Sequence, residues 1–150
     1  MTTISGPFVE ALVGKMVSHI WRGSGSTLFV EFGDLAPGKV RKGKEGNPVG
    51  ELTLMMDFWR IENPRSVLVG VWSSEGKWPK AFERLLGAKV AAVEFFGHIP
   101  EITVSLDNGR RIVSFSPVEG QPDWAVLTRK PALGSLCVRR GGLGVDSRSS

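Results

Sequence analysis

The chain has 150 residues and a mass of 16.3 kDa, a length typical of one domain. Hydrophobic residues make up 41% and charged residues 23%, which excludes wholesale disorder. No apolar run approaches the roughly 18–20 residues of a membrane span, and the first residues do not resemble a signal peptide. A lone cysteine, Cys137, fits a reducing compartment. We therefore expect a cytoplasmic protein without membrane contact.

The net charge of +4 comes from two short segments. Residues 39–45 carry four cations against one carboxylate, and residues 129–150 carry five cations against one carboxylate, while the rest of the chain is slightly acidic. A dedicated nucleic-acid domain more often spreads Lys and Arg along one face of a regular element. Basic loops that only aid solubility produce the same pattern, so the charge alone does not identify a partner.

The chain contains an internal similarity. The nine residues from Val9 to Val17 align with those from Phe82 to Val90, at an offset of 73 positions, with identical Glu, Leu, Gly and Val. Each copy predicts a short helix that begins near a proline and stops at a glycine, followed by a strand. Chance similarity between two amphipathic segments is the alternative explanation.

The predicted elements follow the two copies in order. The first copy has a helix from Pro7 to Gly14, and the second has one from Pro79 to Gly87. Asn108 and Gly109 predict a tight hairpin turn in the second copy, where the first copy instead has a longer loop from Asp34 to Gly50. Strands are expected at 15–22, 27–33, 51–61, 66–72, 88–96, 101–107, 110–116, 124–128 and 136–140.

These elements predict an α+β fold, mainly antiparallel β. We expect two tandem helix-plus-β-meander units, at about 7–72 and 79–140, with pseudo-twofold symmetry around one core, because one meander with one short helix would leave an apolar face exposed. Together they form a single β-rich domain over residues 1–140. Residues 141–150, rich in Gly and Ser, are expected to be a flexible C-terminal tail.

Enzyme signatures are mostly lacking. The sequence has no phosphate-binding loop, no dinucleotide fingerprint and no nucleophile elbow. His19 and His98 do not have metal-ligand spacing, and Cys137 lies in an apolar, strand-like triplet that suits a buried side chain better than a nucleophile. We expect no cofactor and no metal.

Four carboxylates keep a small enzyme or ligand-binding domain open as an alternative. Asp57 and Glu94 each interrupt an otherwise apolar strand, and Glu119 and Asp123 lie in a predicted loop. A carboxylate among apolar neighbours is a candidate acid, whereas a carboxylate on the wet face of a strand is only solvated. This alternative requires that they converge, with His19, on a pocket between the halves.

Three tryptophans are candidate contact residues. Trp72 and Trp78 bracket one loop, and Trp124 closes another. Tryptophan offers a large contact area with one polar N–H, which suits a binding site, but it also suits a loop that must be held against a core.

These features resemble small bacterial proteins of uncharacterised families. The resemblance rests on Leu12-Val13-Gly14 with its following strand, on Trp78 to Gly87 and on Glu119 to Trp124, and it covers most of residues 8–140. It implies no activity and transfers no catalytic residue. Some compact β-rich domains of this size are immunity proteins that neutralise a toxin by binding it, an analogy of size and class only.

The leading hypothesis is a non-enzymatic binding module that recognises an acidic protein partner. In a duplicated scaffold, a specific function is expected where the copies differ, which is the loop 34–50. Its cations are Lys39, Arg41, Lys42 and Lys44. The alternative is a nucleic-acid-binding domain that uses this loop and the C-terminal arginines. Exposed sheet edges leave a homodimer open.

Overall fold

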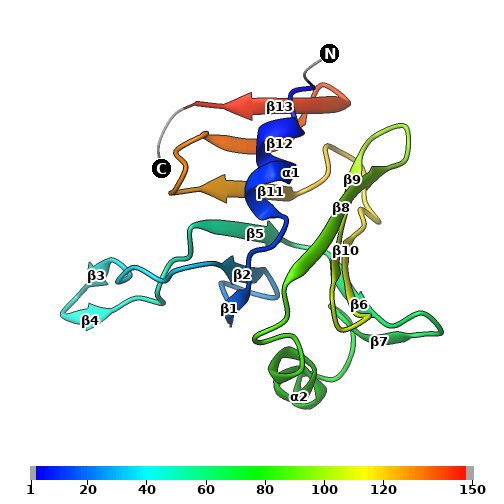
Figure 1. Cartoon of the computed structure of the whole chain (residues 1–150). Coiled ribbons are helices and arrows are strands. Elements are labelled where there is room, and N and C mark those ends of the chain that lie inside the picture. Colours follow the sequence, from blue (N-terminus) through cyan, green and yellow to red (C-terminus); the bar gives the residue numbers. More distant parts are fainter. Residues whose placement is uncertain (1–2, 148–150) are drawn as a thin grey trace.

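The structure is a computed structural model that describes residues 3–147 (Figure 1). Its helices are α1 (Gly6–Leu12), the 3-10 helix η1 (Glu75–Lys77) and α2 (Trp78–Glu83). Its strands are β1 (Val17–Arg22), β2 (Leu28–Phe32), β3 (Val40–Arg41), β4 (Lys44–Glu45), β5 (Leu52–Met56), β6 (Trp59–Glu62), β7 (Val67–Gly70), β8 (Val90–Phe96), β9 (Glu101–Leu106), β10 (Arg111–Ser114), β11 (Trp124–Thr128), β12 (Ser135–Arg139) and β13 (Gly142–Asp146). No helix within the described range is long and apolar enough to cross a lipid bilayer.

The strands form two large antiparallel sheets and one small hairpin. The first sheet has six strands in the order β1-β2-β5-β11-β12-β13, and the second has five in the order β7-β6-β10-β9-β8. The hairpin consists of β3 and β4. The prediction of an α+β fold made mostly of antiparallel strands is therefore confirmed.

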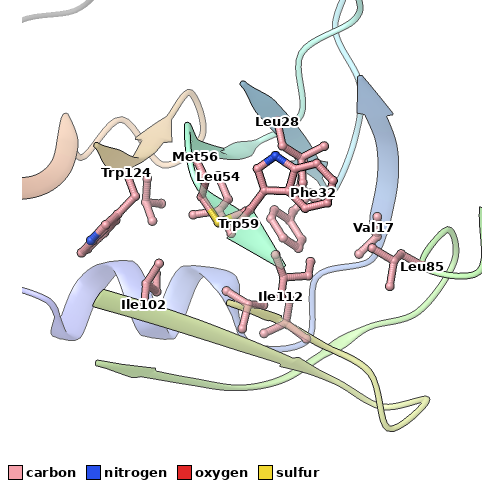
Figure 2. Packing of buried hydrophobic residues seen from close by; sticks show 14 of the residues in the cluster. Val17, Leu28, Phe32, Leu54, Met56, Trp59, Leu85, Ile102, Ile112 and Trp124 are labelled. Carbon is pink, nitrogen blue, oxygen red and sulfur yellow. The ribbon is translucent and has the colours of Figure 1, made fainter. Parts of the chain in front are cut away.

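One hydrophobic core joins the two sheets (Figure 2). The six-stranded sheet contributes alternate residues such as Val30, Leu54 and Val126, as a strand with one buried face should. The five-stranded sheet contributes Ile102 and Ile112 in the same way. Complete burial of each such side chain stabilises the fold by roughly 1.5–3 kcal/mol, so neither sheet is expected to be stable without the other.

The chain passes between the sheets twice. It leaves the six-stranded sheet after β5 to begin β6 in the other sheet, and it returns between β10 and β11. A tryptophan is the first residue after each crossing. The indole N–H of Trp59 donates to the carbonyl of Ser26 at 2.9 Å, and that of Trp124 donates to the carbonyl of Pro100 at 3.0 Å. Both rings are buried, and each indole N–H bonds to a loop of the sheet that the chain has just left.

The segments that follow the two helices pair with each other. Gly14 and Gly87, with φ of 89° and 85°, turn the chain from each helix into this pairing, at an angle that favours glycine. An isolated antiparallel bridge joins Met16 to Lys89. Four backbone hydrogen bonds flank it: Gly14 N–H to Val90 O, Gly87 N–H to Val17 O, Val17 N–H to Ala88 O and Val90 N–H to Lys15 O, at 2.8–2.9 Å.

The C-terminal segment differs from its prediction. Residues 142–146 were expected within a flexible tail, but they form β13, which pairs with β12 over the five positions from Ser135↔Asp146 to Arg139↔Gly142. The pairing places Leu143 and Val145 against the core cluster, and this burial outweighs the low strand propensity of the glycines. The rest of the expected tail lies partly outside the described residues.

Candidate functional site

The four predicted loop cations lie on and beside a projecting hairpin. Figure 1 shows β3 and β4 extending away from the two sheets. Arg41 and Lys44 pair across the hairpin, Lys42 lies in its turn, and Lys39 precedes β3. All four side chains are exposed. The hairpin therefore presents a cluster of positive charges to solvent. It lies within the segment that was predicted from the sequence to be a long loop.

The base of this hairpin is held to the body. Within the loop, Ala36 and Val49 form an antiparallel bridge with hydrogen bonds of 2.7 and 2.9 Å, which joins the two arms of the loop below the hairpin strands. The His19 ring lies 2.9 Å from the Asn47 side-chain oxygen, which joins the loop to β1. A Cβ on Gly38 would come within 2.1 Å of the Asn47 carbonyl, so this close approach of two backbones requires glycine. The cations are thus carried on a fixed base.

A cavity of about 510 Å³ lies beside the base of the hairpin. Trp21 and Phe29 form part of its lining, and their rings stack with centroids 4.0 Å apart and planes 7° from parallel. The loop that carries the hairpin contributes Pro37 and Lys39, and the loop between β11 and β12 contributes Arg129 and others. The lining is mostly apolar with a few polar groups, as is usual in binding sites of this volume.

A buried carboxylate, Glu31, lies against the cavity. Only 1% of this residue is exposed. One of its oxygens accepts hydrogen bonds from the Gly50 N–H at 3.1 Å and from the Thr53 hydroxyl. The other accepts from the Trp21 indole N–H at 2.7 Å. Glu31 therefore fixes the orientation of the indole ring and ties three segments together, and its donors compensate for its burial.

Arg129 connects the two loops on either side of the cavity. Its Nε donates to the Gly50 carbonyl at 3.1 Å, and one terminal nitrogen donates to the Asp34 carbonyl at 2.7 Å. Because these acceptors are neutral carbonyl oxygens, they do not compensate the positive charge of the guanidinium beside the cavity. Its backbone N–H also donates to the Glu51 carbonyl at 2.8 Å. The arrangement holds the hairpin loop in place.

Glu51 secures the start of the same loop. Its carboxylate accepts the Asp34 N–H at 2.7 Å and forms an ion pair with Lys15 at 2.9 Å. The Asp34 hydrogen bond, followed by the Lys15 contacts, lowers the pKa of Glu51 below its ordinary value of 4.5. The charged form of Glu51 is therefore the one that supports the loop.

The four predicted pocket carboxylates do not line this cavity. Asp57 accepts the Thr27 hydroxyl at 2.7 Å, and its N–H donates to the Asp123 carbonyl at 3.1 Å, so the two crossings of the chain contact each other at these residues. Glu94 and Glu119 are exposed. The carboxylate at the cavity is Glu31, which sequence reasoning missed because it occupies a polar position in an alternating strand. The sequence could have identified it, because Phe29 and Glu31 are two residues apart on one strand and their side chains therefore face the same side of the sheet.

The three predicted contact tryptophans have different environments. Trp78 and Trp124 are only 3% and 2% exposed and belong to the core cluster, an environment that does not suit the partner contact predicted for them. Trp72 is 71% exposed. It forms an aromatic cluster with Phe58 and Phe115, whose ring centroids lie 5.6–6.1 Å apart. Trp78 begins α2 and Trp124 begins β11, and both elements pack their apolar side chains against the core.

The remaining candidates are scattered. Cys137 is half-buried on β12, and His98 is exposed between β8 and β9. Among residues 3–147, no group of three or more His, Cys, Asp or Glu side chains is arranged to hold a metal ion. Of the C-terminal arginines, Arg139 forms an ion pair with Asp146 at 3.6 Å, and Arg148 lies outside the described residues.

Comparisons with known proteins do not assign a family: no family model matches the chain, and no match was found among curated proteins or solved structures.

Proposed function

We propose that this protein is a non-enzymatic binding module that recognises an acidic protein surface through the cationic hairpin β3–β4. The observation that carries the proposal is the exposure of Lys39, Arg41, Lys42 and Lys44 on a projection whose base is fixed to the body. Exposed charges on a fixed support steer a partner of opposite charge and restrict its orientation. An immunity-like role, in which binding neutralises the partner, is one form of this function.

The proposal includes a duplicated scaffold. The equivalent residue in the other half is found by adding 73 to a number in the first half or subtracting 73 from a number in the second half. By this rule the hydrogen bond from Gly14 N–H to Val90 O is equivalent to the one from Gly87 N–H to Val17 O. The same operation maps the Met16–Lys89 bridge onto itself, as a pseudo-twofold axis requires. Register irregularities also fall at corresponding places, between Val17 and His19 and between Val90 and Ala92. These correspondences support descent from a half-length unit.

Sheet composition supports the same origin. The six-stranded sheet contains β1, β2 and β5 of the first half and β11, β12 and β13 of the second half. The five-stranded sheet contains β8, β9 and β10 of the second half and β6 and β7 of the first half. Each half therefore crosses into the sheet begun by its counterpart. The hairpin has no equivalent in the second half, where a tight turn joins β9 to β10. This difference between the halves is why the hairpin is assigned the specific function.

A charge-matched pair of variants tests the proposal. Arg41→Ser/Lys42→Ser/Lys44→Ser removes three hairpin cations, and a control removes three exposed cations near α2: Lys77→Ser/Lys80→Ser/Arg84→Ser. Both variants and the wild type serve as bait in lysate of the producing cell, and each captured protein is then purified. We expect an acidic protein that binds wild type and control equally and binds the hairpin variant at least about tenfold more weakly in 50 mM salt. Equal binding by all three forms would overturn the proposal.

The nucleic-acid alternative is tested by the same variants. Micromolar protein is mixed with duplex DNA at 50 mM and 200 mM salt, and complexes are detected by gel shift. A shift at low salt that disappears at high salt and requires the hairpin cations would favour nucleic acid, because phosphate binding weakens steeply with salt. The proposal expects no shift that depends on the hairpin.

A further inference from the structure

The cavity beside the base of the hairpin has no role in electrostatic steering. Its volume is about 510 Å³, and the stacked Trp21 and Phe29 rings contribute aromatic surface to its lining. Glu31 and Thr53 hold this surface by hydrogen bonds to the Trp21 indole N–H and to each other. An aromatic lining held in one orientation favours another aromatic ring, because edge-to-face or offset-stacked contacts add to the burial of apolar area.

The charge around the cavity determines what accompanies that ring. Lys39 and Arg129 line the cavity, and the hairpin beyond it carries three further cations. The single carboxylate in the lining, Glu31, is nearly inaccessible and accepts three hydrogen bonds. The accessible charge is therefore positive, and it selects an anionic group next to the ring.

The position of the cations favours an extended occupant. Arg41, Lys42 and Lys44 are exposed on the hairpin and do not belong to the cavity lining. A small aromatic acid that filled the cavity would contact Lys39 and Arg129 at most. A peptide segment with its ring in the cavity and carboxylates on both sides would use the hairpin cations as well.

We infer that the cavity between the loops 34–50 and 129–134 receives an aromatic side chain from an acidic segment of the partner protein. This inference rests on the proposed function and names the chemistry that the partner presents: an aromatic residue flanked by Asp and Glu. The hairpin cations attract the segment, and the Trp21–Phe29 surface holds its ring. Such buried aromatic anchors commonly dominate the energy of an interface.

Three blocked heptapeptides test the inference by titration against the ¹⁵N-labelled full chain, followed by the shifts of backbone amides. The first is acidic with a central Phe, the second replaces Phe with Ala, and the third keeps Phe but replaces Asp and Glu with Asn and Gln. We expect the first peptide to bind at least about tenfold more tightly than either of the others. Only the two Phe peptides should shift amides that line the cavity.

Two variants localise the ring. Phe29→Ala removes half of the stacked surface, and Ala132→Trp fills the cavity from an exposed lining residue that is not expected to affect folding. In both, the preference for Phe over Ala should fall below about twofold. The matched control is Phe115→Ala, which removes a half-buried ring from the separate Trp72 cluster and should keep the preference.

The outcomes separate this inference from the proposed function. If both acidic peptides bind equally, and only through the hairpin cations, the proposed function stands and the aromatic anchor is wrong. If the acidic and neutral Phe peptides bind equally, the acidic partner is wrong. Three outcomes would each overturn the inference. The first is that Phe29→Ala and Ala132→Trp keep the preference for Phe, and the second is that no peptide binds. The third is that phenylacetate binds as tightly as the acidic Phe peptide.

Discussion

Replacing Glu31 by leucine should destabilise the protein by about 2–4 kcal/mol. The change removes the acceptor for the Gly50 N–H, the Thr53 hydroxyl and the Trp21 indole N–H. Gly50 and Thr53 are buried, so each loses its partner without access to water, at about 1–3 kcal/mol per group. The half-buried Trp21 indole can turn toward water and adds less. The added apolar surface of leucine offsets part of the sum.

Glu31→Gln provides an intermediate case. The glutamine keeps one carbonyl acceptor but presents an NH₂ group where the second carboxylate oxygen accepted a hydrogen bond, so we expect about half the loss. Urea unfolding followed by far-ultraviolet circular dichroism gives the free energy of unfolding of each form. Glu94→Gln, on an exposed carboxylate, is the control and should lie within about 0.5 kcal/mol of the wild type. If Glu31→Leu also lies within that range, the proposed role of this carboxylate in holding the cavity is incorrect.

Two further predictions concern the loop base. Because the Asp34 N–H and Lys15 lower the pKa of Glu51 below 4.5, its contribution to stability is complete above that pH and is lost as the pH falls through the folded-state pKa. The difference in unfolding free energy between the wild type and Glu51→Gln should therefore be largest at neutral pH and shrink below pH 4.5, and a constant difference would contradict this. A Cβ at Gly50 would lie 2.6 Å from the Phe32 carbonyl oxygen, so Gly50→Ala should cost about 1–3 kcal/mol by chemical denaturation. Gly76→Ala meets no atom within 4 Å and should leave stability nearly unchanged, and an equal loss in both variants would refute the steric reason.

Local patterns in the sequence predicted most of the elements. Alternation of apolar and polar residues indicated β2 and β9, and the Asn108-Gly109 pair indicated the turn before β10, which the structure contains with Gly109 at a φ of 84°. These features depend on interactions between near neighbours, which is why they can be recognised without the fold. β13 was missed because its glycines have low strand propensity, and only pairing with β12 makes the strand favourable.

The tryptophans illustrate the limit of residue chemistry as a guide to a site. Trp72, Trp78 and Trp124 looked equivalent in the sequence, yet only Trp72 is exposed. Whether each ring is buried depends on how the helix, strand or loop that carries it packs against the core. That is a property of packing between distant elements and not of the residue itself.

The sequence alone determined the strand-rich class, the similarity between the segments at Gly14 and Gly87, and the concentration of positive charge near the hairpin. Each of these features depends only on residues that are close together in the chain. Only the tertiary structure decided that β5 lies beside β11 and that Trp21, Glu31 and Arg129 surround one cavity. These side chains come from strands and loops far apart in the chain. Their convergence depends on sheet register, which the burial of the whole core determines.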